Sequence, residues 1–323
     1  MPKLPKRFHM LEYLMYISAF AGIAFILFII YFVFNKAAPV LTHSGLGLLT
    51  SAGFDSQISD AFYSSADAPA LTFGMLGLLC GTLLSTLLAL VIASVISIGV
   101  AVTICELAPK PLAAVILAVV RLMSSIPSVI FGLIGVMLVV PLVEKAFITV
   151  DMQIEYLEFF QMTGRNLLST VIVLTFMIAP TIITLSVDAL SSVPHIYKET
   201  GFAFGMSHYR TIWKILLPAA RPGLIAGIIL GAGRGIGEAI AVSMVCGGVG
   251  IVPSLSHGFA AFLTPVLPLS AAIINKSEAM SVAAVESALF ACGALLLVIG
   301  MAFSLAARYV ITHLSSGGTT YEV

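Results

Sequence analysis

Two charged residues, Arg234 and Glu238, stand in an otherwise apolar, glycine-rich stretch that runs from Gly223 to Val242. If the stretch is one helix, their spacing places both side chains on one face, where they can pair. A guanidinium offers a planar fork of donors that fits the oxygens of an oxyanion. The carboxylate would accept a hydrogen bond from an anion that still carries a proton, such as monohydrogen phosphate, and would repel one that carries none, such as sulfate.

Glycines accompany these charges at helical spacing. Gly227, Gly231 and Gly235 recur every fourth residue, and the first two fall on the face of the charges. This spacing favours close helix packing in a membrane. A dinucleotide-binding loop is excluded because no strand precedes the stretch. Two interpretations of the charges stay open: they line the path of an anion, or they form a buried ion pair that holds helices together.

A second group of polar residues surrounds Pro127. Ser125 and Ser128 flank this proline between two apolar runs. Proline removes a helical hydrogen-bond donor, and a broken helix is tolerated at membrane depth where its backbone lines a cavity. The hydroxyls of both serines would then face a pathway. A proline kink without any ligand is the alternative.

A polar segment, residues 188–221, carries the signals of two short helices joined by a tight turn. Pro194 suits the start of a helix. Gly205 and Ser207 indicate a helix end that is followed by a new N-cap. Apolar residues then recur at helical spacing up to Pro218, which we expect to end the second helix.

The elements that carry these residues are predicted to be membrane helices. Of 323 residues, 60% are hydrophobic and 9% are charged, whereas soluble domains have roughly 25% charged residues. About 20 apolar residues cross a bilayer as a helix, and six segments qualify or come close: Leu14–Phe34, Phe73–Ile104, Val129–Val143, Leu167–Val187, Pro222–Val245 and Val282–Ala307. The first is expected to be an anchor rather than a signal peptide, because its apolar run is too long.

The distribution of lysine and arginine predicts the orientation. With the N-terminus inside, the cytoplasmic segments hold Lys3, Lys6, Arg7, Lys110, Arg121, Lys198, Arg210, Lys214, Arg221 and Arg308. The outer segments hold only Lys36, Lys145, Arg165 and Lys276, and they carry the acidic residues Asp55, Asp60, Asp67, Glu144, Asp151, Glu155, Glu158 and Glu278. Both termini are therefore expected in the cytoplasm.

Several classes of function are disfavoured. The net charge is zero, so no basic surface points to nucleic acid. The four cysteines lie in apolar stretches without a CxxC pair, and the six histidines show no ligand spacing, so no metal site is indicated. No phosphate-binding loop of the G-x-x-x-x-G-K-[ST] type occurs. No catalytic constellation was found, and any ATP hydrolysis is expected in a separate chain.

The segment at 188–221 resembles the cytoplasmic loop of ABC-importer permeases, whose pattern is E-A-A-x3-G-x9-I-x-L-P. The matching residues are Glu199, Thr200, Gly201, Gly205, Ile215, Leu217 and Pro218, with Thr200 and Gly201 in place of two alanines. In that family the loop docks into a groove on the ATPase subunit. The resemblance implies that these residues couple the chain to such a partner.

Four further motifs are similar to those of the phosphate-specific importer permeases of the PstC type. They are Phe73-Gly74 with Gly81-Thr82-Leu83, Glu106-Leu107-Ala108-Pro109, the stretch from Ile126 to Gly135, and the stretch from Gly233 to Val242. Three positions depart from the family pattern: Leu78, Ala239 and Gly248. Residues 1–72 match weakly. A related oxyanion therefore stays open as the substrate.

The resemblance implies a type I ABC-importer permease of six spans in a prokaryotic inner membrane. Its expected partners are a PstA-like second permease, two ATPase subunits that bind ATP and magnesium, and an extracytoplasmic phosphate-binding protein. We expect an anchor and outer loop at 1–72, a permease core at 73–310 and a tail at 311–323. The alternative from a different class is an ion-coupled secondary transporter, in which Arg234 and Glu238 would relay protons.

Overall fold

The computed structural model describes residues 6–64 and 71–315 as a bundle of helices. Six of these helices are long and apolar enough to cross a membrane: Glu12–Ser44, Leu76–Leu107, Ser128–Phe147, Leu167–Ser191, His208–Gly237 and Ala283–Ala306. The prediction of an all-α membrane protein with six spans is confirmed. Lys3, Asp67 and the tail from residue 316 onward lie outside the described residues.

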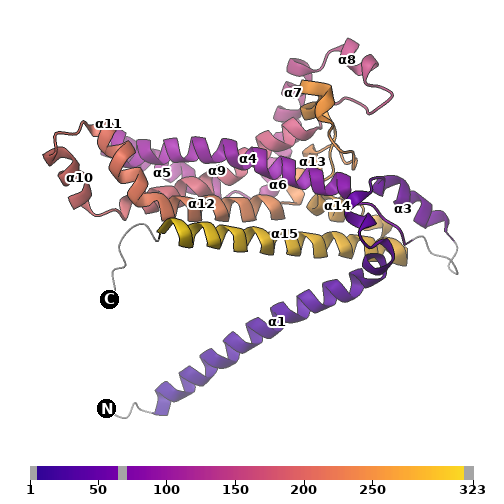
Figure 1. Ribbon diagram of the computed structural model, residues 1–323, viewed down its shortest axis with the longest axis horizontal. Coiled ribbons are helices and arrows are strands. Elements are labelled where there is room, and N and C mark those ends of the chain that lie inside the picture. Colours follow the sequence, from indigo (N-terminus) through magenta and orange to yellow (C-terminus); the bar gives the residue numbers. More distant parts are fainter. Residues whose placement is uncertain (1–5, 65–70, 316–323) are drawn as a thin grey trace.

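The centre of the bundle is α9 (Leu167–Ser191), which packs against α4 (Leu76–Val102), α5 (Lys110–Ser125) and α12 (Leu217–Gly237). Because α9 is apolar on nearly every face, it belongs in the interior, and Leu174, Ile178 and Ile182 are almost fully buried. The last long helix, α15 (Ala283–Ser315), lies along α12 and also contacts α1 (Lys6–Ser44), whose first turns lean away from the bundle (Figure 1).

Glycines on α12 allow the close approach of α9. A Cβ atom on Gly223 would lie 2.5 Å from Cβ of Ala189, and one on Gly231 would lie 2.6 Å from Cγ1 of Ile182. Side chains of α9 therefore fill the space beside the glycines. The predicted close packing is confirmed.

The third span is broken where the sequence predicted. After α5, Ile126 and Pro127 are extended, and α6 (Ser128–Ile134) begins directly after the proline. This helix continues through a π-helical turn (Gly135–Val139) into α7 (Val140–Phe147).

The fifth span differs from its prediction at both ends. It begins at α11 (His208–Thr211), passes through a π-helical turn (Ile212–Leu216) and continues as α12. Pro218 does not end a helix: it directly follows the π-helical turn, at the start of α12, and the helix continues through it. The predicted single span Pro222–Val245 is also wrong: α12 ends at Gly237, and α13 (Ile240–Val245) follows a break at Glu238 and Ala239.

The remaining short elements gather at the two ends of the bundle. At one end, α10 (His195–Ala203) and α11 lie near the C-terminal part of α15, and at the opposite end lie α3 (Phe54–Tyr63) and α8 (Val150–Glu155) (Figure 1). The other elements are α2 (Gly47–Thr50), a π-helical turn (Thr103–Leu107) that closes α4, α14 (Leu269–Asn275) and two 3-10 helices (Leu255–Leu263 and Ser277–Ser281).

Candidate functional site

Arg234 lies in the last turn of α12 and is half-buried. Its Nη1 atom donates a hydrogen bond of 2.9 Å to Oγ1 of Thr181, near the middle of α9. A hydroxyl fixes the direction of the guanidinium but leaves its charge uncompensated. Most N–H donors of the guanidinium are left for another acceptor.

Glu238 does not pair with Arg234. Helix α12 ends at Gly237, so the two residues are not on one helical face, and no salt bridge joins them in the described part of the chain. Instead Oε1 of Glu238 accepts a hydrogen bond of 3.0 Å from the backbone N–H of Ala241 and so caps α13. Ser270 donates to the backbone carbonyl of Glu238 at 2.8 Å. The expectation that both side chains share one helical face is wrong, because the helix ends between them, and the ion-pair interpretation that depended on it finds no support among the described residues.

Ser125, Pro127 and Ser128 lie at the break between α5 and α6. Ser125 is exposed and donates to the carbonyl of Leu122 at 2.7 Å, and Ser128 is half-buried. One turn into α6, a Cβ atom on Gly132 would lie 3.0 Å from Cα of Ala241 on α13. The breaks in the third and fifth spans therefore lie close to each other.

Sequence reasoning misplaced Arg121. We counted it as cytoplasmic, yet it lines a hollow of about 290 Å³ together with Thr181 and Thr184 from the middle of α9. Hydropathy did not indicate that Arg121 lies among the spans, because α5 is too short to count as a span. The available signal was the spacing of Arg121 and Ser124, which puts a guanidinium and a hydroxyl on one helical face.

The turn between α10 and α11 has the predicted conformation. Pro194 is the N-cap of α10, and Gly205 has φ +70, in the left-handed region that favours glycine. Oγ of Ser207 accepts from the backbone N–H of Arg210 at 3.4 Å and caps α11. Contrary to the prediction, the second helix is not short, since it continues into the membrane span.

The residues of the loop pattern divide into a packed set and an exposed set. Gly201 is buried, and a Cβ atom there would lie 2.9 Å from Cδ1 of Ile215. Glu199 and Thr200 are exposed on α10. Large apolar side chains are also exposed at this end of the bundle, above all Phe204 at 81% and Trp213 at 69%. The helix pair is thus held together from within and presents both polar and large apolar side chains on its outer surface.

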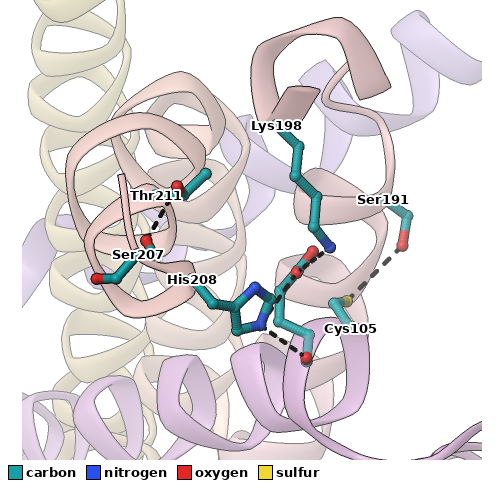
Figure 2. Close-up of polar contacts among 7 residues, drawn as sticks. Cys105, Ser191, Lys198, Ser207, His208 and Thr211 are labelled. Carbon is teal, nitrogen blue, oxygen red and sulfur yellow. Dashed lines mark hydrogen bonds and ion pairs between the residues drawn. The ribbon is translucent and has the colours of Figure 1, made fainter. Parts of the chain in front are cut away.

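An ion pair that sequence reasoning missed ties this helix pair to α4 (Figure 2). The carboxylate of Glu106, at the end of the second span, pairs with Nζ of Lys198 on α10. Nε2 of His208 on α11 lies 3.1 Å from the backbone oxygen of Glu106 and 3.9 Å from its carboxylate. Glu106 therefore contacts both arms of the loop. The sequence offered Glu106 only as part of a motif, without a partner.

We expect Glu106→Gln to loosen α10 without unfolding the bundle. A partly exposed ion pair contributes about 1 kcal/mol or less, so amide exchange in His195–Ala203 should speed up by at most about fivefold, measured by hydrogen–deuterium exchange. Glu286→Gln is the matched control, because it breaks the pair with Lys36 at 2.9 Å. Equal exchange of α10 in the wild type and Glu106→Gln would show that the pair does not hold it.

Three comparisons with known proteins agree with one another. The model of the family "Binding-protein-dependent transport system inner membrane component" matches residues 94–316. The chain is 32% identical to the "Probable ABC transporter permease protein YqgH" of Bacillus subtilis, over 74% of this chain and 72% of that protein. It is also 32% identical to the "Phosphate transport system permease protein PstC 1" of Mycobacterium tuberculosis, over 75% and 73%.

Solved structures show the same fold at low sequence identity. A chain of the MetNI methionine ABC transporter in an inward-facing conformation superposes with a TM-score of 0.54 at 20% identity, covering 73% of this chain and 93% of that chain. A chain of a bacterial ABC transporter involved in the import of alginate gives a TM-score of 0.56 at 14% identity, covering 94% and 96%.

Proposed function

The chain belongs to the family of binding-protein-dependent transport system inner-membrane components, and from this premise we propose that it carries inorganic phosphate into the cell. It is the membrane permease of an ABC importer, a class in which a separate subunit hydrolyses ATP and a binding protein delivers the substrate. The alternative of an ion-coupled secondary transporter is wrong, because the family match covers most of the chain.

The substrate proposal rests on one observation, the hydrogen bonding of Arg234. Its hydrogen-bond partner is a hydroxyl, so a positive charge with free donors stands inside the membrane-spanning part. A charge at that depth costs about 2.5 kcal/mol or more, and such residues usually face a water-filled path. A tetrahedral oxyanion fits the free donors of a guanidinium. Relatives named as phosphate permeases support phosphate as this anion.

We assign the neighbouring residues to the same pathway. Ser125, Pro127 and Ser128 would expose hydroxyls and unpaired backbone beside the break of the third span. Glu238 would order α13 through one carboxylate oxygen, and its other oxygen would accept the proton of hydrogen phosphate. This arrangement would select against sulfate, which has no proton to donate at neutral pH.

We further propose that the helix pair α10 and α11 docks on the ATPase. Glu199 and Thr200 would contact the partner together with the exposed Phe204, whereas Gly201, Gly205, Ile215 and Pro218 would hold the pair in shape. The complete transporter would contain a PstA-like second permease and two ATPase subunits, which bind ATP and magnesium. Motion of this helix pair would reach the fifth span directly, since α11 and α12 are joined through one π-helical turn.

Uptake by the reconstituted transporter tests this function. The chain is placed in vesicles with its second permease, ATPase subunits and binding protein, and labelled phosphate, sulfate and molybdate are supplied in turn. We expect ATP-dependent accumulation of phosphate and little of the other two. Preferential uptake of sulfate or molybdate would replace phosphate by another oxyanion.

We propose that α10 and both termini face the cytoplasm. The bias of lysine and arginine still supports this orientation after Arg121 is removed from the count. In Figure 1, α10 and the last turns of α15 lie at one end, opposite α3 and α8.

An impermeant maleimide tests the orientation. It should label Glu155→Cys from outside the cell and Lys214→Cys only in inverted vesicles, since both positions are exposed. The chain without these substitutions gives the background from its own cysteines. Labelling of Lys214→Cys from outside alone would invert the topology.

A further inference from the structure

The hollow beside α9 has a largely apolar wall, in which one guanidinium and three hydroxyl groups supply the polar atoms. It measures about 290 Å³ and is lined by Arg121, Ser124, Thr181, Thr184, Leu185 and Leu230. Thr181 is also the residue that accepts the hydrogen bond of Arg234. Thr181 therefore connects the hollow with Arg234.

The hollow lies at mid-membrane depth, on the α10 side of Arg234. Thr181 and Thr184 are near the middle of the span Leu167–Ser191. Leu230 precedes Arg234 by about one turn of α12, which runs from the α10 end toward the middle. Arg121 is about 16 Å along α5 from Lys110, at 1.5 Å per residue. Headgroup phosphates, at the edges of a hydrocarbon core about 30 Å thick, are too distant to be its partners.

The charge of Arg121 is exposed and uncompensated. Its side chain is exposed, and no salt bridge to it occurs within residues 6–64 and 71–315. Hydrocarbon would make such a charge costly, so Arg121 must face water, an anion or a partner's carboxylate. The hydroxyls favour the first two, because Thr184 and Ser124 donate to the carbonyls of Pro180 and Val120 and keep their oxygens free as acceptors.

We propose that Arg121, with Ser124, Thr181 and Thr184, forms a second binding station for a protonated oxyanion, one turn to the cytoplasmic side of Arg234. The proposal rests on the proposed function, whose pathway it extends. Arg121 supplies charge, and the hydroxyl oxygens accept the protons of hydrogen phosphate. Thr181 contacts both stations, so the anion can pass from Arg234 to Arg121 without crossing a region that lacks polar partners.

Thiol chemistry in the complete reconstituted transporter tests the station. Arg121→Cys is treated with an anionic and a cationic methanethiosulfonate of similar size, with and without inorganic phosphate. We expect the anionic reagent to react several times faster, because Arg234 remains nearby, and phosphate to slow its reaction. Lys110→Cys, exposed at the start of the same helix, should show no protection by phosphate. The unsubstituted chain gives the background.

Uptake gives the second readout. Arg121→Gln should lower phosphate uptake about tenfold, Arg121→Lys should keep a larger share, and Lys110→Gln should change little. Normal uptake by Arg121→Gln, or a thiol at position 121 that neither reagent reaches, would overturn the station while leaving phosphate import intact. If the wild type imports no phosphate, the proposed function is wrong, but the binding station is still tested. A faster reaction of the Arg121→Cys thiol with the anionic reagent would then still show that position 121 lines a path for anions.

Discussion

Replacement of Arg234 by lysine is expected to abolish most phosphate uptake although the positive charge is kept. Lysine has no planar fork and cannot hold Thr181 and a tetrahedral anion in the same geometry. Each hydrogen bond to a charged group contributes about 1.5–3 kcal/mol, and about 1.4 kcal/mol corresponds to a factor of ten. Loss of one such bond should therefore lower ATP-dependent uptake at least about tenfold, measured in vesicles at equal levels of the assembled transporter.

Arg221→Lys is the matched control for this experiment. Arg221 belongs to the same helix, is exposed, and lies at the α10 end, away from the hollow. Its replacement should leave uptake nearly unchanged. If Arg234→Lys transports at the wild-type rate, transport does not depend on the planar geometry of the guanidinium, and the assignment of Arg234 to the substrate site is wrong.

Glutamine substitutions separate a substrate role from a structural one. Arg234→Gln does not leave the carboxylate of Glu238 without a partner, because that carboxylate is hydrogen-bonded to the N-terminus of α13. Glu238→Gln keeps an oxygen that can cap the same N–H. We therefore expect the double variant to be folded, by its melting temperature, and inactive. A stable double variant with normal phosphate uptake would make both residues dispensable for transport.

The sequence alone predicted the features that depend on one residue or on one run of neighbouring residues. Apolar length predicted the six spans, Pro127 predicted the break of the third, and Gly205 with Ser207 predicted the turn before α11. Each of these follows from one residue type or from one run of residues. The placement of a helix end at Gly205 needed no knowledge of distant parts of the chain.

The failures arose where a distant contact decides the structure. The break at Glu238 lies in a glycine-rich run that reads as one helix, and the contact that sequence reasoning lacked is the hydrogen bond from Ser270, 32 residues away. Arg121 reads as a loop residue because α5 is short, and only packing against α9 gives its depth. The pairing of Glu106 with Lys198 joins residues far apart in the sequence. Residue types suggested oxyanion chemistry, but only the fold shows which polar groups surround Arg234.

Replacement of Gly205 by valine should reduce phosphate uptake and stimulated ATPase activity together. Gly205 has φ +70 with no atom near its missing Cβ, so the cost comes from the backbone alone. A left-handed residue with a side chain costs roughly 1–2 kcal/mol, and more when it is β-branched. Relaxation of that strain would swing α10 away from α11 and so misplace the surface proposed to meet the ATPase.

Gly45 offers a matched control for this effect. It also has a positive φ, +50, and no atom within 4 Å of its missing Cβ, but it lies after α1, far from α10. Gly45→Val should carry a similar backbone cost and keep both activities. We expect Gly205→Val to insert at normal levels with uptake and stimulated ATPase lowered by about tenfold, the factor given by about 1.4 kcal/mol. Equal losses in the two variants would assign the effect to general destabilisation, and normal uptake in Gly205→Val would remove the helix pair from the coupling route.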